Sequence, residues 1–111
     1  MINKVFILGR LGKNPELKST DKTTIATFSV ATSEKYADKE VTQWHNCKAF
    51  GPVANNLAKF FHKGDMIFIE GKIVYNAYEK DGKKMTFTDI VVLTWSFCGD
   101  KGKDEKANDA F

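Results

Sequence analysis

The alternation of apolar and polar positions along the chain predicts five β-strands. Successive side chains of a strand point to opposite faces, so a strand with one buried face has an apolar residue at every second position. By this pattern the strands are Lys4–Leu11, Thr24 to about Ser33, a third around Trp44–Phe50, Met66–Tyr78, and Met85 to about Phe97. The first strand is apolar on both faces, which predicts that it packs on a core and on a second surface.

Short polar segments between these strands predict turns and one loop. Thr20–Thr23 and Asp81-Gly82 have the residues of hairpin turns. Glu34–Thr42 is rich in charge and has no apolar alternation. We expect this segment to be an exposed loop that lifts Tyr36 away from any regular strand.

One segment of the chain has helical spacing. Pro52 suits the first turn of a helix, where its missing N–H costs no hydrogen bond. The apolar residues that follow at helical spacing are Val53, Ala54, Leu57, Phe60 and Phe61. Lys63-Gly64 is typical of a helix end. The pattern predicts a short amphipathic helix whose Phe60 and Phe61 pack into the core.

The order of the elements is strand, strand, strand, helix, strand, strand. Strands and helices do not alternate, which argues against a parallel sheet of βαβ units. An all-β chain of five bent strands, with one short helix between the third and the fourth, fits a Greek-key barrel of the OB type. In that fold the second and third strands and the adjoining loops bind oligonucleotides, and the third strand here is the one that carries Trp44.

This third strand places large aromatic residues beside a cation. One face carries Trp44, Asn46, Lys48 and Phe50, and the other carries His45, Cys47 and Ala49. Two interpretations remain open. Either both faces are buried between two layers, or the rings are exposed and stack on unpaired bases while the Lys48 ammonium lies near a phosphate.

Length and composition indicate one globular domain. The chain has 111 residues, of which 42% are hydrophobic and 28% charged. Residues 1–99 contain 14 Lys and Arg against 10 Asp and Glu, whereas residues 100–111 contain 3 against 4. We expect a basic domain over 1–99 and a disordered, mixed-charge tail over 100–111. The small positive excess is compatible with a polyanionic partner without establishing one.

The sequence has no pattern typical of an enzyme or a metalloprotein. Cys47 and Cys98 lack a Cys-x-x-Cys spacing, and His45 and His62 do not complete a set of metal ligands. No nucleophile–base pair or phosphate-binding loop occurs at mechanistic spacing. We expect no catalytic residue, metal or cofactor. Without a signal-like start or a long apolar run, we also expect a cytoplasmic protein that does not enter a membrane.

Several short motifs follow one another along about residues 1–98. They are Asn3-Lys4-Val5, Gly9-Arg10-Leu11-Gly12, Pro15-Glu16, Ala31-Thr32-Ser33-Glu34, Gln43-Trp44-His45, Phe50-Gly51, Lys63-Gly64 and Ile69-Glu70-Gly71. Together they resemble the bacterial-type single-stranded DNA-binding proteins. The resemblance implies that the chain coats and protects single-stranded DNA without strong sequence preference, during DNA replication, recombination or repair. It also implies a homotetramer, although the apolar first strand is equally compatible with a dimer.

The resemblance further implies which residues bind the nucleic acid. The stacking aromatics are Trp44, Phe50, Tyr36 and Tyr78, and the cations near phosphates are Lys4, Arg10, Lys48, Lys63 and Lys72. Family members commonly have tryptophan in place of both tyrosines, and basic residues in place of Asn46, Pro52, Val74 and Asn76. We therefore expect weaker stacking, lower affinity and a shallower dependence on salt than is usual in the family.

The C-terminus differs from that of the cellular family members. These carry a long linker and an acidic tip ending in Pro-Phe, which recruits replication and repair proteins. Here the chain ends in Asp109-Ala110-Phe111, so recruitment of replication or recombination proteins would rest on Asp109 and Phe111. The short tail resembles phage and mobile-element versions.

Two alternatives to DNA binding remain open. An OB-fold adaptor of the primosome type would use the same face for a protein partner, and it would tolerate the loss of basic residues noted above. RNA is the second alternative, because the sequence offers nothing that would sense a 2′-hydroxyl. Salt-sensitive binding to homopolymeric single strands separates the adaptor from the DNA-binding protein.

Overall fold

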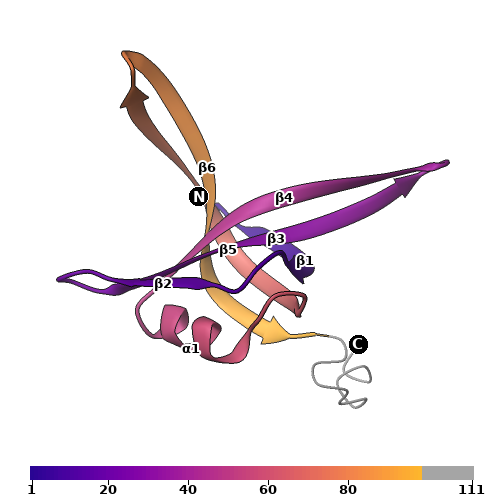
Figure 1. The fold of residues 1–111 in the computed structure, drawn as a ribbon, viewed down its shortest axis with the longest axis horizontal. Coiled ribbons are helices and arrows are strands. Elements are labelled where there is room, and N and C mark those ends of the chain that lie inside the picture. Colours follow the sequence, from indigo (N-terminus) through magenta and orange to yellow (C-terminus); the bar gives the residue numbers. More distant parts are fainter. Residues whose placement is uncertain (99–111) are drawn as a thin grey trace.

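The computed structural model describes residues 1–98, and Figure 1 shows their arrangement. In chain order the elements are β1 (Val5–Leu11), β2 (Glu16–Ser19), β3 (Thr24–Tyr36), β4 (Lys39–Phe50), α1 (Pro52–Phe60), β5 (Met66–Lys80) and β6 (Lys83–Phe97). The expected tail, with Asp109 and Phe111, lies outside the described residues.

The strands close into a barrel. Around the barrel, β1 pairs with β5, β5 with β6, β6 with β4, and β4 with β3. The circle closes where Arg10 and Leu11 of β1 pair with Ala31 and Val30 of β3. β2 extends the sheet beyond β3. The predicted five-stranded barrel of the OB type is confirmed, with α1 between β4 and β5, the third and fourth barrel strands in chain order.

Gly9 lies in β1 close to this closure. A Cβ atom at Gly9 would lie 2.3 Å from the carbonyl oxygen of Ala31 and 2.8 Å from Cγ1 of Val30. A glycine permits the backbones of β1 and β3 to approach this closely because it has no side chain. Gly9 is therefore part of the barrel closure.

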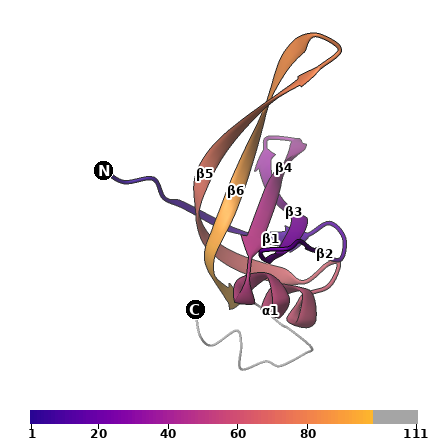
Figure 2. The same cartoon turned by 90° about the vertical axis from the view of Figure 1, so that its left-hand side faces the viewer.

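The core consists of the inward-facing side chains of the barrel strands and of α1. Its largest fully buried side chains are Phe61, Leu57, Ile67, Ile69, Val30 and Cys47. α1 covers one end of the barrel, as Figure 2 shows, and buries Ala54 and Leu57 there. Phe60 is 38% exposed and packs beside Trp95 and Phe97 on the rim. The prediction that two adjacent rings enter the core is thus right for Phe61 and wrong for Phe60.

The helix begins where the sequence predicts and ends earlier. Pro52 stands in its first turn, after Gly51 with a φ of 64°. The predicted end at Lys63-Gly64 is wrong, because α1 ends at Phe60 and Phe61 has an extended backbone. The buried Phe61 ring thus enters the core from an extended residue and lies outside the helical stripe.

Two hairpins extend beyond the barrel as arms, which Figure 1 shows projecting in different directions. We call residues 33–42 the β3–β4 arm and residues 75–88 the β5–β6 arm, and every residue in both ranges is exposed. Asp81 and Gly82 form the turn of the second arm with φ of 55° and 77°, so the predicted turn is confirmed. The turn at Thr20–Thr23 is also confirmed.

The expected loop over Glu34–Thr42 is wrong. β3 continues to Tyr36, β4 begins at Lys39, and the two strands pair up to that point. The hydroxyl groups of Ser33 and Thr42 lie 2.9 Å apart across the pair. Since neither face of this arm is buried, its strands need no apolar alternation, and the pattern that reveals other strands is absent here.

Candidate nucleic-acid interface

The outer face of β4 carries exposed aromatic rings. Trp44 is 58% exposed and Phe50 is 42% exposed, while Cys47 and Ala49 on the opposite face are buried. Of the two interpretations of this strand, burial of both faces is therefore wrong. An exposed flat ring on a barrel strand is free to stack on a planar ligand.

The Trp44 ring rests against the loop that follows β1. A Cβ atom at Gly12 would lie 2.4 Å from Cζ3 and 3.0 Å from Cη2 of the indole. Any residue other than glycine at this position would therefore displace the ring. On the neighbouring strand Trp44 is paired with Ala31, whose small side chain leaves the indole uncovered on that side.

A groove of about 390 Å³ lies on the same outer surface, and we call it the β4 groove. Its polar and aromatic lining comes from four strands and one loop and includes Lys13, Glu16, Ser29, Asn46, Lys48, Phe87 and Asp89. Sequence analysis missed Lys13, Phe87 and Asp89. Alternation along β6 places Phe87 and Asp89 on one face, but only the pairing of β6 with β4 brings that face beside Lys48.

The charge of Lys48 is balanced within the groove. Its Nζ lies 3.5 Å from Oδ2 of Asp89, and Nδ2 of Asn76 donates a hydrogen bond to the same oxygen at 2.7 Å. Asp89 is only 7% exposed. Lys48 and Asn76 together compensate the buried carboxylate, so Lys48 is a partly neutralised cation.

The two remaining predicted aromatics lie on the arms. Tyr78 stacks on Phe87 in the β5–β6 arm, with ring centroids 4.9 Å apart and an interplanar angle of 14°. Tyr36 is exposed near the tip of the β3–β4 arm, where its hydroxyl donates to Oε1 of Glu34 at 2.7 Å. This hydrogen bond, together with the Glu34 charge, raises the pKa of Tyr36.

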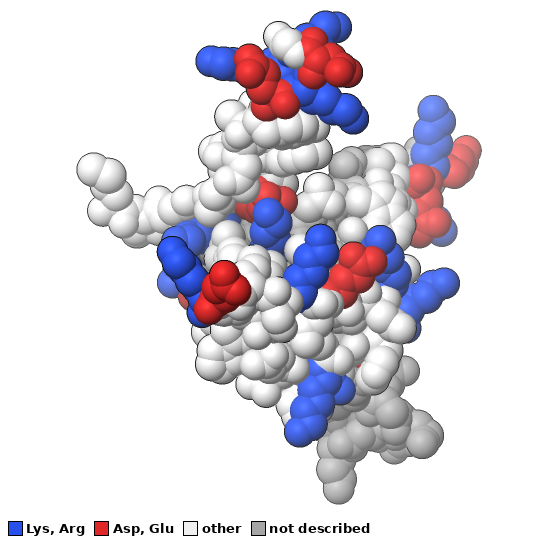
Figure 3. Space-filling model, turned by 60° about the vertical axis from the view of Figure 1, so that its left-hand side comes forward, with Lys and Arg blue, Asp and Glu red and all other residues white. Residues whose placement is uncertain are grey.

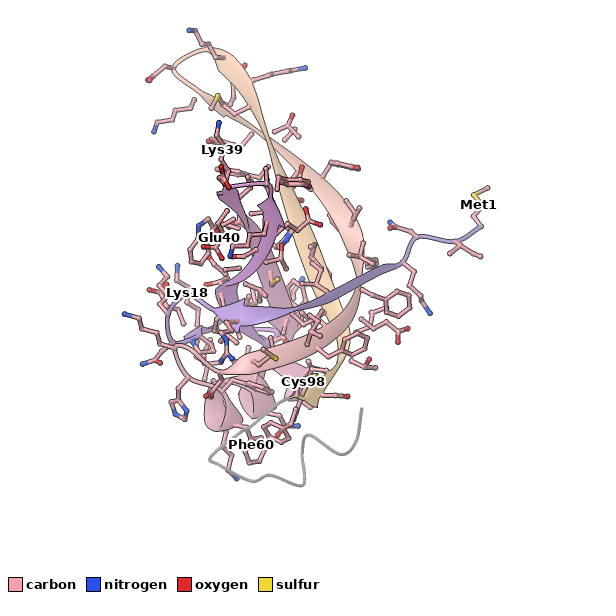
Figure 4. All side chains as sticks on the ribbon, turned by 90° about the vertical axis from the view of Figure 1, so that its right-hand side faces the viewer. Met1, Lys18, Lys39, Glu40, Phe60 and Cys98 are labelled. Carbon is pink, nitrogen blue, oxygen red and sulfur yellow. The ribbon has the colours of Figure 1, made fainter. Side chains whose placement is uncertain are left out.

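The arms are also where charges of both signs gather. Lys39 and Glu40 lie at the tip of the β3–β4 arm, and Figure 4 shows them well above Phe60 and Cys98. In Figure 3 Lys and Arg side chains alternate with Asp and Glu, most densely at the tip of the β5–β6 arm. The charged residues of that tip are Glu79, Lys80, Asp81, Lys83 and Lys84. The face in Figure 3 is thus mixed in sign.

Comparison with known proteins identifies the family. Residues 2–98 match the Single-strand binding protein family. The chain belongs to this family. A Single-stranded DNA-binding protein of Staphylococcus epidermidis is 36% identical over 109 residues, which is 96% of this chain and 83% of the relative. A protein of the same name from Neisseria meningitidis serogroup A is 34% identical over 116 residues, which is 98% of this chain and 66% of the relative.

A third relative matches over a shorter range. The Single-stranded DNA-binding protein of Xylella fastidiosa is 38% identical over 97 residues, which is 81% of this chain and 59% of the relative. The chain therefore matches its relatives over most of its own length, while each of these relatives has residues that the match does not cover.

In this Single-strand binding protein family member, the predicted cations do not form one patch. Lys4 lies 2.8 Å from Oε2 of Glu70, measured from its Nζ. Arg10 donates from Nη1 to the carbonyl oxygen of Gly64 at 2.9 Å. Both residues belong to the β1 side of the barrel, which β3 separates from β4. Neither residue lines the β4 groove.

The other predicted cations lie elsewhere on the barrel, and of these Lys48 lines the groove. Lys72 is paired with Val91, and Val91 is paired with Lys48, so the two lysines share one row across the sheet. Two strand spacings separate them by about 10 Å. The backbone N–H of Lys63 donates to Oδ1 of Asn14 at 2.8 Å, which ties the segment after α1 to the loop after β1.

Two negative findings concern residues 1–98. This part of the chain contains no group of three or more His, Cys, Asp or Glu side chains that could hold a metal ion. None of its helices is long and apolar enough to span a bilayer.

We expect Cys47 to be unreactive in the folded protein. Burial, and to a lesser extent the charge of Asp89, raises the pKa of this thiol from 9.0 to about 12. Because the thiolate is the reactive form, iodoacetamide at about pH 8 should modify Cys47 only after unfolding. The measurement uses the Cys98→Ser variant, in which Cys47 is the remaining cysteine. Fast modification of this variant well below its melting temperature would contradict the expectation.

The raised pKa of Cys47 also makes the stability of the fold depend on pH. Above pH 9.0 the unfolded thiol ionises, whereas the folded one stays protonated until about pH 12. The unfolded state therefore binds fewer protons in this window, and the free energy of unfolding should fall as the pH rises through it.

Proposed function

We propose that the chain binds single-stranded DNA and protects it during DNA replication, recombination or repair, as a binding protein and not as an enzyme. The observation that carries the proposal is the exposed pair Trp44 and Phe50 on the outer face of β4, in a member of the Single-strand binding protein family. The relatives from Staphylococcus epidermidis and Neisseria meningitidis are named single-stranded DNA-binding proteins, which supports the same function here.

Base stacking supplies most of the binding free energy in this proposal. Each base stacked on an aromatic ring contributes about 1 to 3 kcal/mol, and every base has a flat face, so stacking requires no particular sequence. Trp44 and Phe50 provide rings on the barrel, while Tyr36 and the Tyr78–Phe87 pair provide rings on the two arms. A single strand that runs over the β4 groove passes between these arms.

Contacts to phosphates supply a smaller share of the binding free energy in this proposal. Lys48 is engaged by Asp89, and Lys4 is engaged by Glu70, so fewer cations are available than the sequence suggests. Lys13 lines the β4 groove, and Lys72 lies in the same row of the sheet as Lys48; both are exposed and have no ion pair among residues 1–98. Since each neutralised phosphate releases counterions, we expect a shallow dependence of affinity on salt.

We also propose that the chain assembles with copies of itself, as a tetramer or a dimer. The outer side of β1 and β5 supports this, because Phe6 and Leu8 are largely exposed there. Phe6 stacks on Phe68 of β5, with ring centroids 6.1 Å apart. Three neighbouring apolar side chains on one exposed face fit an interface between like subunits.

A primosome-type adaptor is the second candidate. The ion pair between Lys48 and Asp89 favours it, because a protein that binds phosphates gains nothing from an acid in its groove. Such an adaptor would use the β4 face for a protein partner and would bind homopolymeric single strands weakly.

Titration with oligo-dT tests the proposed function against this second candidate. Emission from Trp44 should be quenched by the single strand at low salt and recover in part at high salt. A duplex of the same length is the control and should cause little quenching. Absence of binding to oligo-dT at low salt would reject the DNA-binding function and favour the adaptor.

A further inference from the structure

The β4 groove contains an acid that phosphate binding does not explain. Asp89 is 7% exposed and lines this groove together with Phe87, two positions before it on β6. A carboxylate repels phosphate groups, and its burial costs free energy that pairing must offset. A carboxylate in this place suits a ligand group that donates hydrogen bonds.

One oxygen of this carboxylate is already occupied. Oδ2 accepts a hydrogen bond from Asn76 at 2.7 Å and lies 3.5 Å from the Lys48 ammonium. No hydrogen bond or ion pair within residues 1–98 involves Oδ1. Within that range, every side-chain nitrogen or oxygen that is fully buried has a hydrogen-bond partner. Because Oδ1 has no such partner, it is not fully buried, and solvent or a ligand can reach it. Lys48 and Asn76 therefore hold the carboxylate by one oxygen and leave the other open.

An ionised carboxylate distinguishes the bases by their hydrogen-bond donors. It accepts hydrogen bonds and donates none. The Watson–Crick edge of guanine has two adjacent donors, at N1 and at the N2 amino group. Cytosine and adenine each have one amino group, and the single N–H of thymine lies between two carbonyl oxygens. The open Oδ1 has two lone pairs and can accept from both donors of guanine, so this carboxylate favours guanine most and thymine least.

Phe87 supplies the flat surface that such a base needs. Its ring is exposed, lines the β4 groove, and is held in place by stacking on Tyr78 at a centroid distance of 4.9 Å. Phe87 and Asp89 point to the same side of β6, about 7 Å apart along the strand. A base that stacks on the Phe87 ring can present its edge to Asp89.

We propose that Phe87 and Asp89 form a base-discriminating subsite of the β4 groove, which accepts guanine, and more weakly cytosine or adenine, in preference to thymine. This inference rests on the proposed function, because it concerns one position of a bound single strand. Lys48 and Asn76 are positioning residues in this subsite. The preference applies to one base among several, so the chain as a whole stays tolerant of sequence.

Replacement of guanine by inosine tests the subsite, because inosine lacks only the N2 amino group. The affinity is measured by anisotropy of labelled thymine oligomers that carry either guanine or inosine at the same spaced positions. The wild-type chain should bind the guanine oligomer about fivefold more tightly, or better. In Asp89→Asn this ratio should fall to about one. Equal affinity of the wild type for the two oligomers, or an unchanged ratio in Asp89→Asn, would overturn the proposal.

Two further variants make the result specific. Glu16→Gln removes the other carboxylate that lines the β4 groove and should leave the ratio of guanine to inosine affinity unchanged. Phe87→Ala replaces an exposed ring and provides a second test of the subsite if Asp89→Asn does not fold. This variant should lose more affinity for the guanine oligomer than for all-thymine DNA. Binding of all-thymine DNA without discrimination overturns the subsite alone, whereas no binding of any oligomer overturns the proposed function.

Discussion

Replacement of Trp44 by alanine is expected to weaken binding of oligo-dT by about 1 to 3 kcal/mol, which is about 5- to 150-fold in Kd. Trp44 is exposed on the outer face of β4, so its loss removes one stacking surface of the proposed interface. Its side chain contributes little to the core because it is 58% exposed. The melting temperature should therefore change little.

The measurement is anisotropy of labelled oligo-dT, since tryptophan emission is itself changed by the substitution. Trp44→Phe is the matched control and should retain most of the affinity, because it keeps a ring at the same place. Gly12→Ala should give an intermediate loss, since its Cβ displaces the indole without removing it. If Trp44→Ala binds oligo-dT as well as the wild type, the β4 face is not where bases stack.

Gly9→Ala is expected to destabilise the fold by about 1 to 3 kcal/mol or more. The added Cβ would lie 2.3 Å from the Ala31 carbonyl oxygen, and this contact is with backbone, so β1 and β3 must separate. Separation at this point opens the barrel where Arg10 and Leu11 pair with β3. We expect the melting temperature to fall by at least about 5 °C.

Thermal unfolding followed by circular dichroism measures this effect. Gly12→Ala is the control here as well, because its Cβ meets an exposed side chain rather than backbone. It should lower the melting temperature much less than Gly9→Ala. Equal melting temperatures for the two variants would mean that close approach at Gly9 does not hold the barrel together.

The barrel could be predicted from the sequence because its strands have one buried face. Alternation located all five barrel strands, Pro52 marked the start of α1, and Asp81-Gly82 marked a hairpin. The same reasoning failed on the β3–β4 arm, where no face is buried and the strands therefore have no apolar alternation. It also misplaced Phe60, because helical spacing assigned this residue to the buried stripe, whereas its ring packs beside Trp95 and Phe97 on the rim.

The candidate site was only partly predictable. Alternation within one strand placed Trp44 and Phe50 on the same face, but it left open whether that face is buried or exposed. The contact of Lys48 with Asp89 depends on the pairing of β4 with β6, which brings together residues 41 positions apart in the sequence. Contact between Trp44 and Gly12 likewise depends on how the barrel closes. Such long-range pairings are set by the whole fold and leave no local pattern.

The two arms have a consequence for the evolution of this protein. All their residues are exposed, so lengthening or shortening an arm removes no side chain from the core. Mutations that change the reach of the arms along a nucleic acid are then nearly neutral for folding. Natural selection can adjust the length of nucleic acid covered by one subunit while the barrel, under its own constraints at Gly9 and in the core, stays the same.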